Sequence, residues 1–161
     1  MWYMLPHPVT VTIDVPQRRE DVFTYLDVLA NHEAFTDHML VDWSVSGPDR
    51  GVGAKARVYS KAGGRKEPVD IEVIEVDAPA RNVERNVSAG GKRIGRGTYE
   101  LSELPGGGTR IAFTYSWDRA PLPDRVLAPL VRALLRRGNA RAMERLAEQL
   151  EAASARLRPA A

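Results

Sequence analysis

The sequence contains no cysteine, which excludes disulfide bridges and thiolate metal sites. No stretch approaches the ~20 consecutive apolar residues that span a bilayer. The first ten residues also lack the basic start and the long apolar segment of a secretory signal. These absences favour a soluble, cytoplasmic protein without a transmembrane segment.

A large excess of charge of one sign is also missing. The 23 Lys and Arg residues stand against 21 Asp and Glu, which gives a net charge of +2. Nucleic-acid-binding proteins concentrate basic residues in a stripe, often interleaved with aromatic residues. Here the densest arginines share one segment with glutamates, between Arg132 and Glu148. This pattern is typical of a solvated helix face, and we expect no nucleic-acid partner.

Motifs that bind cofactors are absent as well. There is no glycine-rich phosphate loop with a lysine, no nucleophile elbow and no dinucleotide fingerprint, since "GGKRIGRG" lies between predicted strands. His32 and His38 accompany Glu33 and Asp37, but their spacing puts the two histidines on different helix faces, and zinc would need a further ligand. We interpret these histidines as surface residues and expect neither metal nor cofactor. A histidine acting as an acid or base at a cavity mouth is the alternative.

What the sequence does contain is a regular succession of predicted elements. Residues 9–15 alternate apolar and polar side chains, which predicts a half-buried strand. Pro16 then precedes apolar residues at helical spacing, which predicts a short helix, and a second one follows over residues 27–35. The chain length fits a single domain spanning residues 1–161, with its core at about 8–153.

Six further strands are predicted between glycine-marked turns. They cover residues 39–46, 54–61, 67–77, 81–89, 93–103 and 109–118. A long amphipathic helix follows "PLPDRV", with a late start or a kink expected at Pro129 or Gly138. Its apolar stripe is predicted to be Leu127, Leu130, Val131, Leu134, Leu135, Ala142, Leu146 and Leu150. The fold class is therefore α+β, with a curved antiparallel sheet of seven strands wrapped around the last helix.

This order of elements resembles the START-like helix-grip superfamily, also called SRPBCC or Bet v 1-like, and within it the polyketide cyclase/dehydrase-like branch. The stretches that carry the resemblance are "VTIDVPQRREDVFTYL", "GPDRGVGAKARV", "VIEVDAPARNVERNVSAGG" and "GRGTYELSELPGGGTRIAFTYSWD". The resemblance implies a deep apolar cavity between sheet and helix, and a bacterial source. Members bind lipids, sterols, polyketides or plant hormones, and a minority are aromatases or cyclases. The fold alone does not choose among these functions.

The strand "TRIAFTYSWDR" carries an aromatic face that is either packed core or cavity wall. We expect Ile111 and Phe113 to favour the core, whereas the two readings are balanced for Tyr115 and Trp117, whose polar groups need partners when buried. Trp43 and Tyr99 are expected to join this face from neighbouring strands. The predicted pocket-lining residues are Trp43, Arg85, Tyr99, Phe113, Tyr115, Trp117 and Asn139.

Arg85 and Asn139 are the two candidates with polar side chains outside the aromatic face. Arg85 shares a strand face with Val83 and Val87, so it is either a buried group that meets an acid or a ligand, or is turned outward by a bulge. Asn139 follows Gly138 in the long helix and is either a ligand contact or a solvated rim residue. Catalytic residues are not assigned.

The leading hypothesis is a protein that binds a hydrophobic small molecule, a lipid or a polyketide-like compound, without a cofactor. The alternative is a polyketide aromatase/cyclase-dehydratase that uses acid-base residues in the same cavity. A third interpretation is an interaction role without a ligand, if aromatic packing fills the cavity. A homodimer is compatible with each of them.

Overall fold

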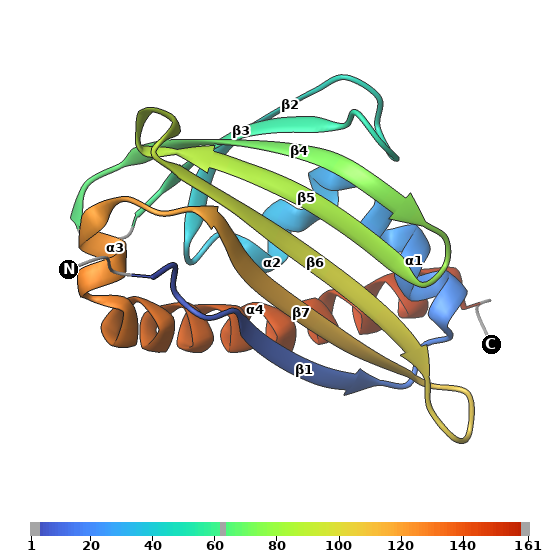
Figure 1. Ribbon diagram of the computed structural model, residues 1–161. Coiled ribbons are helices and arrows are strands. Elements are labelled where there is room, and N and C mark those ends of the chain that lie inside the picture. Colours follow the sequence, from blue (N-terminus) through green and yellow to red (C-terminus); the bar gives the residue numbers. More distant parts are fainter. Residues whose placement is uncertain (1–3, 62–63, 159–161) are drawn as a thin grey trace.

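The computed structural model describes residues 4–61 and 64–158 and shows a curved antiparallel sheet folded around a long helix (Figure 1). The strand order is β1-β7-β6-β5-β4-β3-β2. This is the helix-grip fold that the pattern of elements predicts. No described helix is long and apolar enough to cross a membrane.

The strand boundaries agree with the predicted ones to within one residue. The strands are β1 (Val9–Val15), β2 (Leu40–Ser46), β3 (Lys55–Ser60), β4 (Glu67–Asp77), β5 (Arg81–Ser88), β6 (Arg93–Glu103) and β7 (Thr109–Arg119). Glycines with positive φ, such as Gly47 and Gly106, lie in the turns, where a side chain on Cβ would strain the backbone. Regular alternation between such turns is the reason why this part of the fold is readable from the sequence.

Two short helices separate β1 from β2, as predicted. They are α1 (Arg19–Asp27) and α2 (Glu33–Thr36), and a single 3₁₀ turn, η1 (Leu29–His32), leads into α2. Figure 1 shows α1 and α2 on the same side of the sheet as the terminal helix. Val22, Phe23 and Leu26 of α1 are buried there.

The terminal helical segment is split in two. A short helix, α3 (Leu122–Val126), ends at Leu127, and α4 (Ala128–Leu157) starts just before Pro129. Leu127 has a backbone outside the helical region, at φ −98° and ψ 23°. The expected late start at Pro129 is thus confirmed, whereas α4 continues through Gly138 without a break.

The predicted apolar stripe of this helix is wrong in its first part. Leu127, Leu130 and Leu134 are 50–60% exposed. The residues of α4 that the sheet buries are Asn139, Ala142, Met143, Leu146 and Leu150. At 100° per residue, the three exposed leucines lie roughly 140° around the axis from this buried line. Only Val131 and Leu135 of the early part pack inward, beside Trp117.

The main hydrophobic core lies between the concave face of β1, β6 and β7, helix α1 and helix α4. Its buried members include Val11, Ile111 and Phe113 from the sheet, and Met143 and Leu146 from α4. A second cluster lies under β3 and β4, around Val58 and Val73. Asn82, Glu84 and Asn139 are buried polar residues that interrupt these apolar surfaces.

Candidate functional site

Strand β5 turns its polar residues toward the interior. In the regular pairing of β5 with β6, Asn82 lies opposite Tyr99 and Glu84 opposite Gly97, so strand alternation places both polar residues on the concave face. Asn82 is 2% exposed and Glu84 is 7% exposed. Polar groups on a buried face lose their hydration, which is costly unless something else binds them. We call Asn82, Glu84 and Asn86 the polar row of β5.

Two glycines of β6 give the neighbouring side chains room over this strand. A Cβ on Gly97 would lie 3.1 Å from Glu84 Oε1 and 3.0 Å from the ring of Phe113. A Cβ on Gly95 would overlap the phenol of Tyr115. Side chains of β5 and β7 therefore converge above β6, where any larger residue would separate them.

The carboxyl group of Glu84 lies beside a buried histidine. Nδ1 of His32 is 3.6 Å from Glu84 Oε2, and Nε2 is 2.8 Å from the carbonyl oxygen of Leu26. Because a carbonyl only accepts hydrogen bonds, Nε2 of the neutral ring carries the proton and Nδ1 presents its lone pair to Glu84. The interpretation of His32 as a surface residue is therefore wrong. It is 2% exposed, because η1 turns the ring inward against Phe35 and Tyr99.

Burial sets the protonation of this pair. It lowers the pKa of His32 to about 4 and raises the pKa of Glu84 to about 7, because the interior disfavours the charged form of each group. Between these values the pair is neutral, with the acidic proton on the carboxyl group. A carboxyl group whose pKa is near 7 can accept and return a proton at neutral pH, as general acid-base chemistry requires.

Several buried polar atoms of the described residues have no hydrogen-bond partner in the protein. Those of the polar row, α4 and β7 are Asn82 Oδ1 and Nδ2, Glu84 Oε2, Asn86 Oδ1, Asn139 Nδ2 and Trp117 Nε1. Each unpaired buried group costs ~1–3 kcal/mol. Core packing alone gives no reason for several such groups on one concave face and the helix that covers it. Groups of this kind are expected where a polar ligand atom or water binds.

The aromatic residues of β6 and β7 form two contacting pairs. The Tyr99 and Phe113 rings have centroids 4.6 Å apart, and those of Tyr115 and Trp117 are 4.9 Å apart in an edge-on arrangement. Burial raises the pKa of Tyr115 to about 12 and also raises that of Tyr99 well above its usual value. Both phenols are therefore neutral hydrogen-bonding groups at physiological pH. Tyr99 and Phe113 belong to the main core, and Trp117 packs in a smaller cluster with Val9.

The remaining predicted residues are distributed over separate places. Asn139 is buried, at 6% exposed, on the face of α4 that meets the sheet. Trp43 is half-buried against the second cluster and donates its indole N–H to the Leu40 carbonyl oxygen, 3.2 Å away. The structure therefore does not bring Trp43 into the group formed by Glu84 and Tyr99.

Arg85 is not a buried pocket residue. Its side chain is 47% exposed and pairs with Glu72 across the outer face, at 3.4 Å. The expectation that it shares a face with Val83 and Val87 is correct, but strand alternation makes this the outer face. No bulge in β5 is needed to explain it, because its pairing with β6 is regular.

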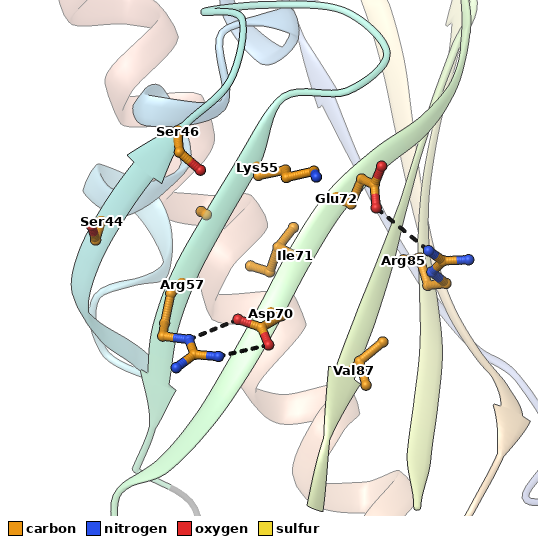
Figure 2. Close-up of a pocket in the computed structure, with 10 residues that line it drawn as sticks. Ser44, Ser46, Lys55, Arg57, Asp70, Ile71, Glu72, Arg85 and Val87 are labelled. Atoms are coloured by element: carbon orange, nitrogen blue, oxygen red, sulfur yellow. Dashed lines mark hydrogen bonds and ion pairs between the residues drawn. The ribbon is translucent and has the colours of Figure 1, made fainter. Parts of the chain in front are cut away.

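An outer groove of about 430 Å³ lies next to Arg85 (Figure 2). Figure 2 shows Arg57 and Asp70 pointing toward one another across β3 and β4, and their two hydrogen bonds measure 2.8 and 2.9 Å. Both arginines of the groove thus have carboxylate partners. Exposed ion pairs of this kind contribute little binding energy, so the buried polar row is the stronger candidate site.

His38 has a structural contact instead of a surface role. Its Nε2 donates to the carbonyl oxygen of Gly138, at 2.9 Å, and its Nδ1 accepts from Arg145, at 3.1 Å. Arg145 also pairs with Asp37. These contacts join α4 to α2 and the residues that follow it. Among residues 4–61 and 64–158 there is no cluster of three or more His, Asp or Glu side chains that could hold a metal.

Sequence reasoning missed Glu84, Asn82 and the inward position of His32. The signal was present in "RNVERNVS", because Asn82, Glu84, Asn86 and Ser88 alternate as regularly as the valines do. Hydrophobicity alone predicts that the valines of this stretch, and not its polar residues, face the interior. The opposing strand carries the second signal, since glycines at positions 95 and 97 face the polar set.

Comparisons with known proteins agree with this architecture. The family described as polyketide cyclase/dehydrase and lipid transport matches residues 6–151. The crystal structure of TTHA0849 from Thermus thermophilus is 23% identical, with a TM-score of 0.74, over 92% of this chain and 99% of that one. A search of curated protein sequences gives no match.

Two further solved structures share the fold. DynU16, a protein of the dynemicin biosynthetic locus, is 22% identical with a TM-score of 0.62, over 89% of this chain and 47% of its own. Ara h 8.0201 is 15% identical with a TM-score of 0.58, over 87% of this chain and 97% of its own. At these identities the likeness concerns the fold.

Proposed function

Because the chain belongs to the polyketide cyclase/dehydrase and lipid transport family of the SRPBCC superfamily, we propose that it binds a hydrophobic small molecule between the sheet and α4. The proposed ligand is a lipid or polyketide-like compound that carries carbonyl or hydroxyl groups along an apolar skeleton. Burial of apolar ligand surface, at ~25 cal/mol per Å², would supply most of the affinity, less the cost of immobilising the ligand.

The observation that carries this proposal is the set of unpartnered polar atoms on β5, β7 and α4. Asn82 offers a donor and an acceptor, Asn139 offers donors, and the Trp117 indole offers one more donor. Carbonyl and hydroxyl oxygens are complementary to this mixture, whereas a pure hydrocarbon would leave all of these groups unpaired. Tyr99 and Phe113 would provide the apolar contact beside them.

A second candidate function is supported by the Glu84–His32 pair. A carboxylate at Glu84 could remove a proton from a carbon next to a ligand carbonyl, which gives an enolate. The same carboxyl group could then return this proton to a departing hydroxyl group, so that water leaves and a carbon–carbon double bond forms. Once Glu84 is protonated, Nδ1 of His32 would accept a hydrogen bond from its carboxyl group. The Glu84 pKa of about 7 suits such a step at neutral pH.

The binding proposal is tested on protein purified from its own host. Native mass spectrometry should show a co-purifying compound, and a panel of lipids and polyketide mimics should raise the melting temperature of the stripped protein. Asn82→Ala and Asn139→Ala should each weaken binding of the best compound by about fivefold or more, since one hydrogen bond contributes ~1 kcal/mol. Arg85→Ala on the outer face is the matched control and should bind normally. The absence of both a bound compound and any thermal shift would contradict the proposal.

The catalytic candidate needs a separate measurement. Glu84→Gln keeps the size of the side chain and removes the proton acceptor, so the product profile of a poly-β-keto mimic should revert to the uncatalysed one while binding persists. Tyr99→Phe removes only a phenol and serves as the comparison. An identical product profile with and without wild-type protein would exclude catalysis and leave the binding proposal intact.

A further inference from the structure

Five large apolar side chains are exposed on α3, at Leu127 and on the first turns of α4. This α3–α4 patch consists of Leu122, Val126, Leu127, Leu130 and Leu134, which are 63, 47, 50, 55 and 60% exposed. Single exposed leucines are ordinary, but a row of them along adjoining helices marks an interaction surface. In Figure 1 the two helices adjoin at one end of the molecule, where the chain leaves β7.

The fold holds this patch in place. Arg93 on β6 forms two hydrogen bonds of 2.6 and 2.8 Å with the carboxylate of Asp124, which is 6% exposed. Arg125 also donates to the carbonyl oxygen of Ala120, at 2.9 Å. A two-pronged arginine–carboxylate pair of this kind fixes α3 in orientation as well as in position. The leucines are therefore displayed by a fixed element.

Positive charge surrounds the patch. From residue 120 to residue 143 the chain contains five arginines and one acidic residue, Asp124, which is buried against Arg93. Arg137 and Arg141 are exposed and lie within about 60° of Leu134 around the axis of α4, on the side of the leucines. On the side of α3, Lys92 and Arg119 line a surface hollow of about 510 Å³ together with Leu122.

Arg132 connects this surface to the start of the chain. It donates hydrogen bonds to the carbonyl oxygens of His7 and Pro8, at 3.0 and 3.3 Å. Met4 and Leu5, a few residues earlier, are 82 and 39% exposed. The segment before β1 is therefore held to α4 by Arg132, and it carries two further exposed apolar side chains, Met4 and Leu5.

We propose that the α3–α4 patch docks on an anionic lipid bilayer. Helices that lie in the membrane interface combine leucines, which enter the acyl boundary, with arginines, which contact lipid phosphates. The patch has both features and no exposed acidic residue between 120 and 143. A second copy of the chain fits less well, because a two-fold interface through this patch would face arginines with arginines. This docking site is separate from the proposed ligand site and does not depend on it.

Vesicle flotation tests the proposal. The wild-type protein should float with phosphatidylcholine vesicles that contain one quarter phosphatidylglycerol, and much less with phosphatidylcholine alone. Binding should fall between 20 mM and 500 mM salt, because the Debye length shortens from roughly 20 Å to about 4 Å. Arg137→Glu/Arg141→Glu should lower the partition coefficient by about 25-fold or more, since each basic residue near the surface contributes roughly fivefold.

Matched variants distinguish the contribution of the patch from effects of net charge, of exposed leucines elsewhere and of misfolding. Leu130→Ser/Leu134→Ser should lower partitioning by about tenfold, whereas Leu157→Ser, at a leucine that is 86% exposed elsewhere, should have no effect. Lys55→Glu/Arg65→Glu reverses two exposed charges outside the patch and controls for net charge. Circular dichroism checks that each variant is folded.

Three results would overturn the proposal. The first is no flotation of the wild-type protein, or equal flotation with both vesicle types. The second is unchanged flotation of both folded patch variants. The third is a lipid-independent dimer in sedimentation velocity that the Leu130→Ser/Leu134→Ser variant abolishes, which would assign the patch to a second copy of the chain.

Discussion

At the scale of single residues, the pairing of Glu84 with His32 makes folding move a proton between two side chains. In the unfolded chain, between pH 4.5 and 6.5, the imidazole is charged and protonated and the carboxyl group is ionised. In the folded protein the carboxyl group holds the proton and the ring is neutral. The number of bound protons is the same in both states, so the pair contributes almost no pH dependence to stability in this range.

Removing one member of the pair should uncover the pH dependence of the other. In Glu84→Gln, the lowered pKa of His32 remains, because burial is its first cause. The unfolded state then binds a proton that the folded state does not, so the free energy of unfolding should fall as the pH drops from 6.5 to 4. The loss is on the order of 3 kcal/mol. Urea unfolding at several pH values measures it.

The opposite variant should give the opposite slope. In His32→Gln the raised pKa of Glu84 remains, so the folded state keeps a proton that the unfolded state releases, and stability should fall as the pH rises from 4.5 to 7, by a similar amount. The double variant Glu84→Gln/His32→Gln is the control and should lose both slopes. Equal slopes in the two single variants would contradict this account of the pair.

Gly95 offers a second test at this scale. A Cβ at this position would overlap the Tyr115 phenol, which must then move from its edge-on contact with Trp117. Gly95→Ala should therefore destabilise the protein by ~1–3 kcal/mol and change its tryptophan fluorescence. Adding Tyr115→Leu should restore part of the lost stability by vacating the space. If the double variant is less stable than both single variants, the overlap is not the cause.

At the scale of elements, period and turn chemistry predicted the strands, but the choice of buried face failed twice. In β5 Arg85 was considered for a buried face with Val83 and Val87, whereas Asn82 and Glu84 occupy the concave face and Arg85 is exposed, although Val83 is 1% exposed. In α4 the leucines near the start were predicted to lie on the same buried face as Leu146. At 100° per residue these leucines lie roughly 140° around the axis from the buried line, so the helical angles separate the two faces and the error was to merge them into one stripe.

The two parts of α4 should respond differently to substitution. Leu146 is fully buried against the sheet, and Leu146→Ala should cost ~2–5 kcal/mol. Leu130→Ala, at a site that is 55% exposed, should change the free energy of unfolding by less than ~0.5 kcal/mol. Thermal or urea denaturation of the two variants measures how the same Leu→Ala change affects the free energy of unfolding at two places on one helix. Similar losses for both variants would mean that the start of α4 is packed in solution.

At the scale of the whole molecule, the sheet is open, with β1 and β2 at its two edges. β1 pairs with β7 over its full length and also packs against α4. β2 pairs only with β3, and this pairing is interrupted at Asp42, which has a positive φ of 56°. The edge strand β1 is therefore better protected against local opening than the edge strand β2.

Amide hydrogen exchange should report this inequality. The amides of β6 and β7 have strand neighbours on both sides and should exchange most slowly, close to the rate set by global unfolding. Those of β2 should exchange at least tenfold faster, through local opening that leaves the rest of the sheet intact. Mass spectrometry after proteolysis resolves these segments. Equal protection of β2 and β7 would show that the sheet opens only as one unit.

The strand order also constrains how the protein forms during its synthesis. Val15, at the end of β1, lies opposite Thr109, at the start of β7, so β1 has no strand partner until almost the entire sheet has left the ribosome. At ~5–20 residues per second, this delay is on the order of ten seconds. During that time β2 to β6 can pair as successive hairpins, while the amphipathic β1 has no strand partner. The pairing of β1 with β7 therefore completes the sheet last, and until then β1 is available to a chaperone that recognises extended apolar segments.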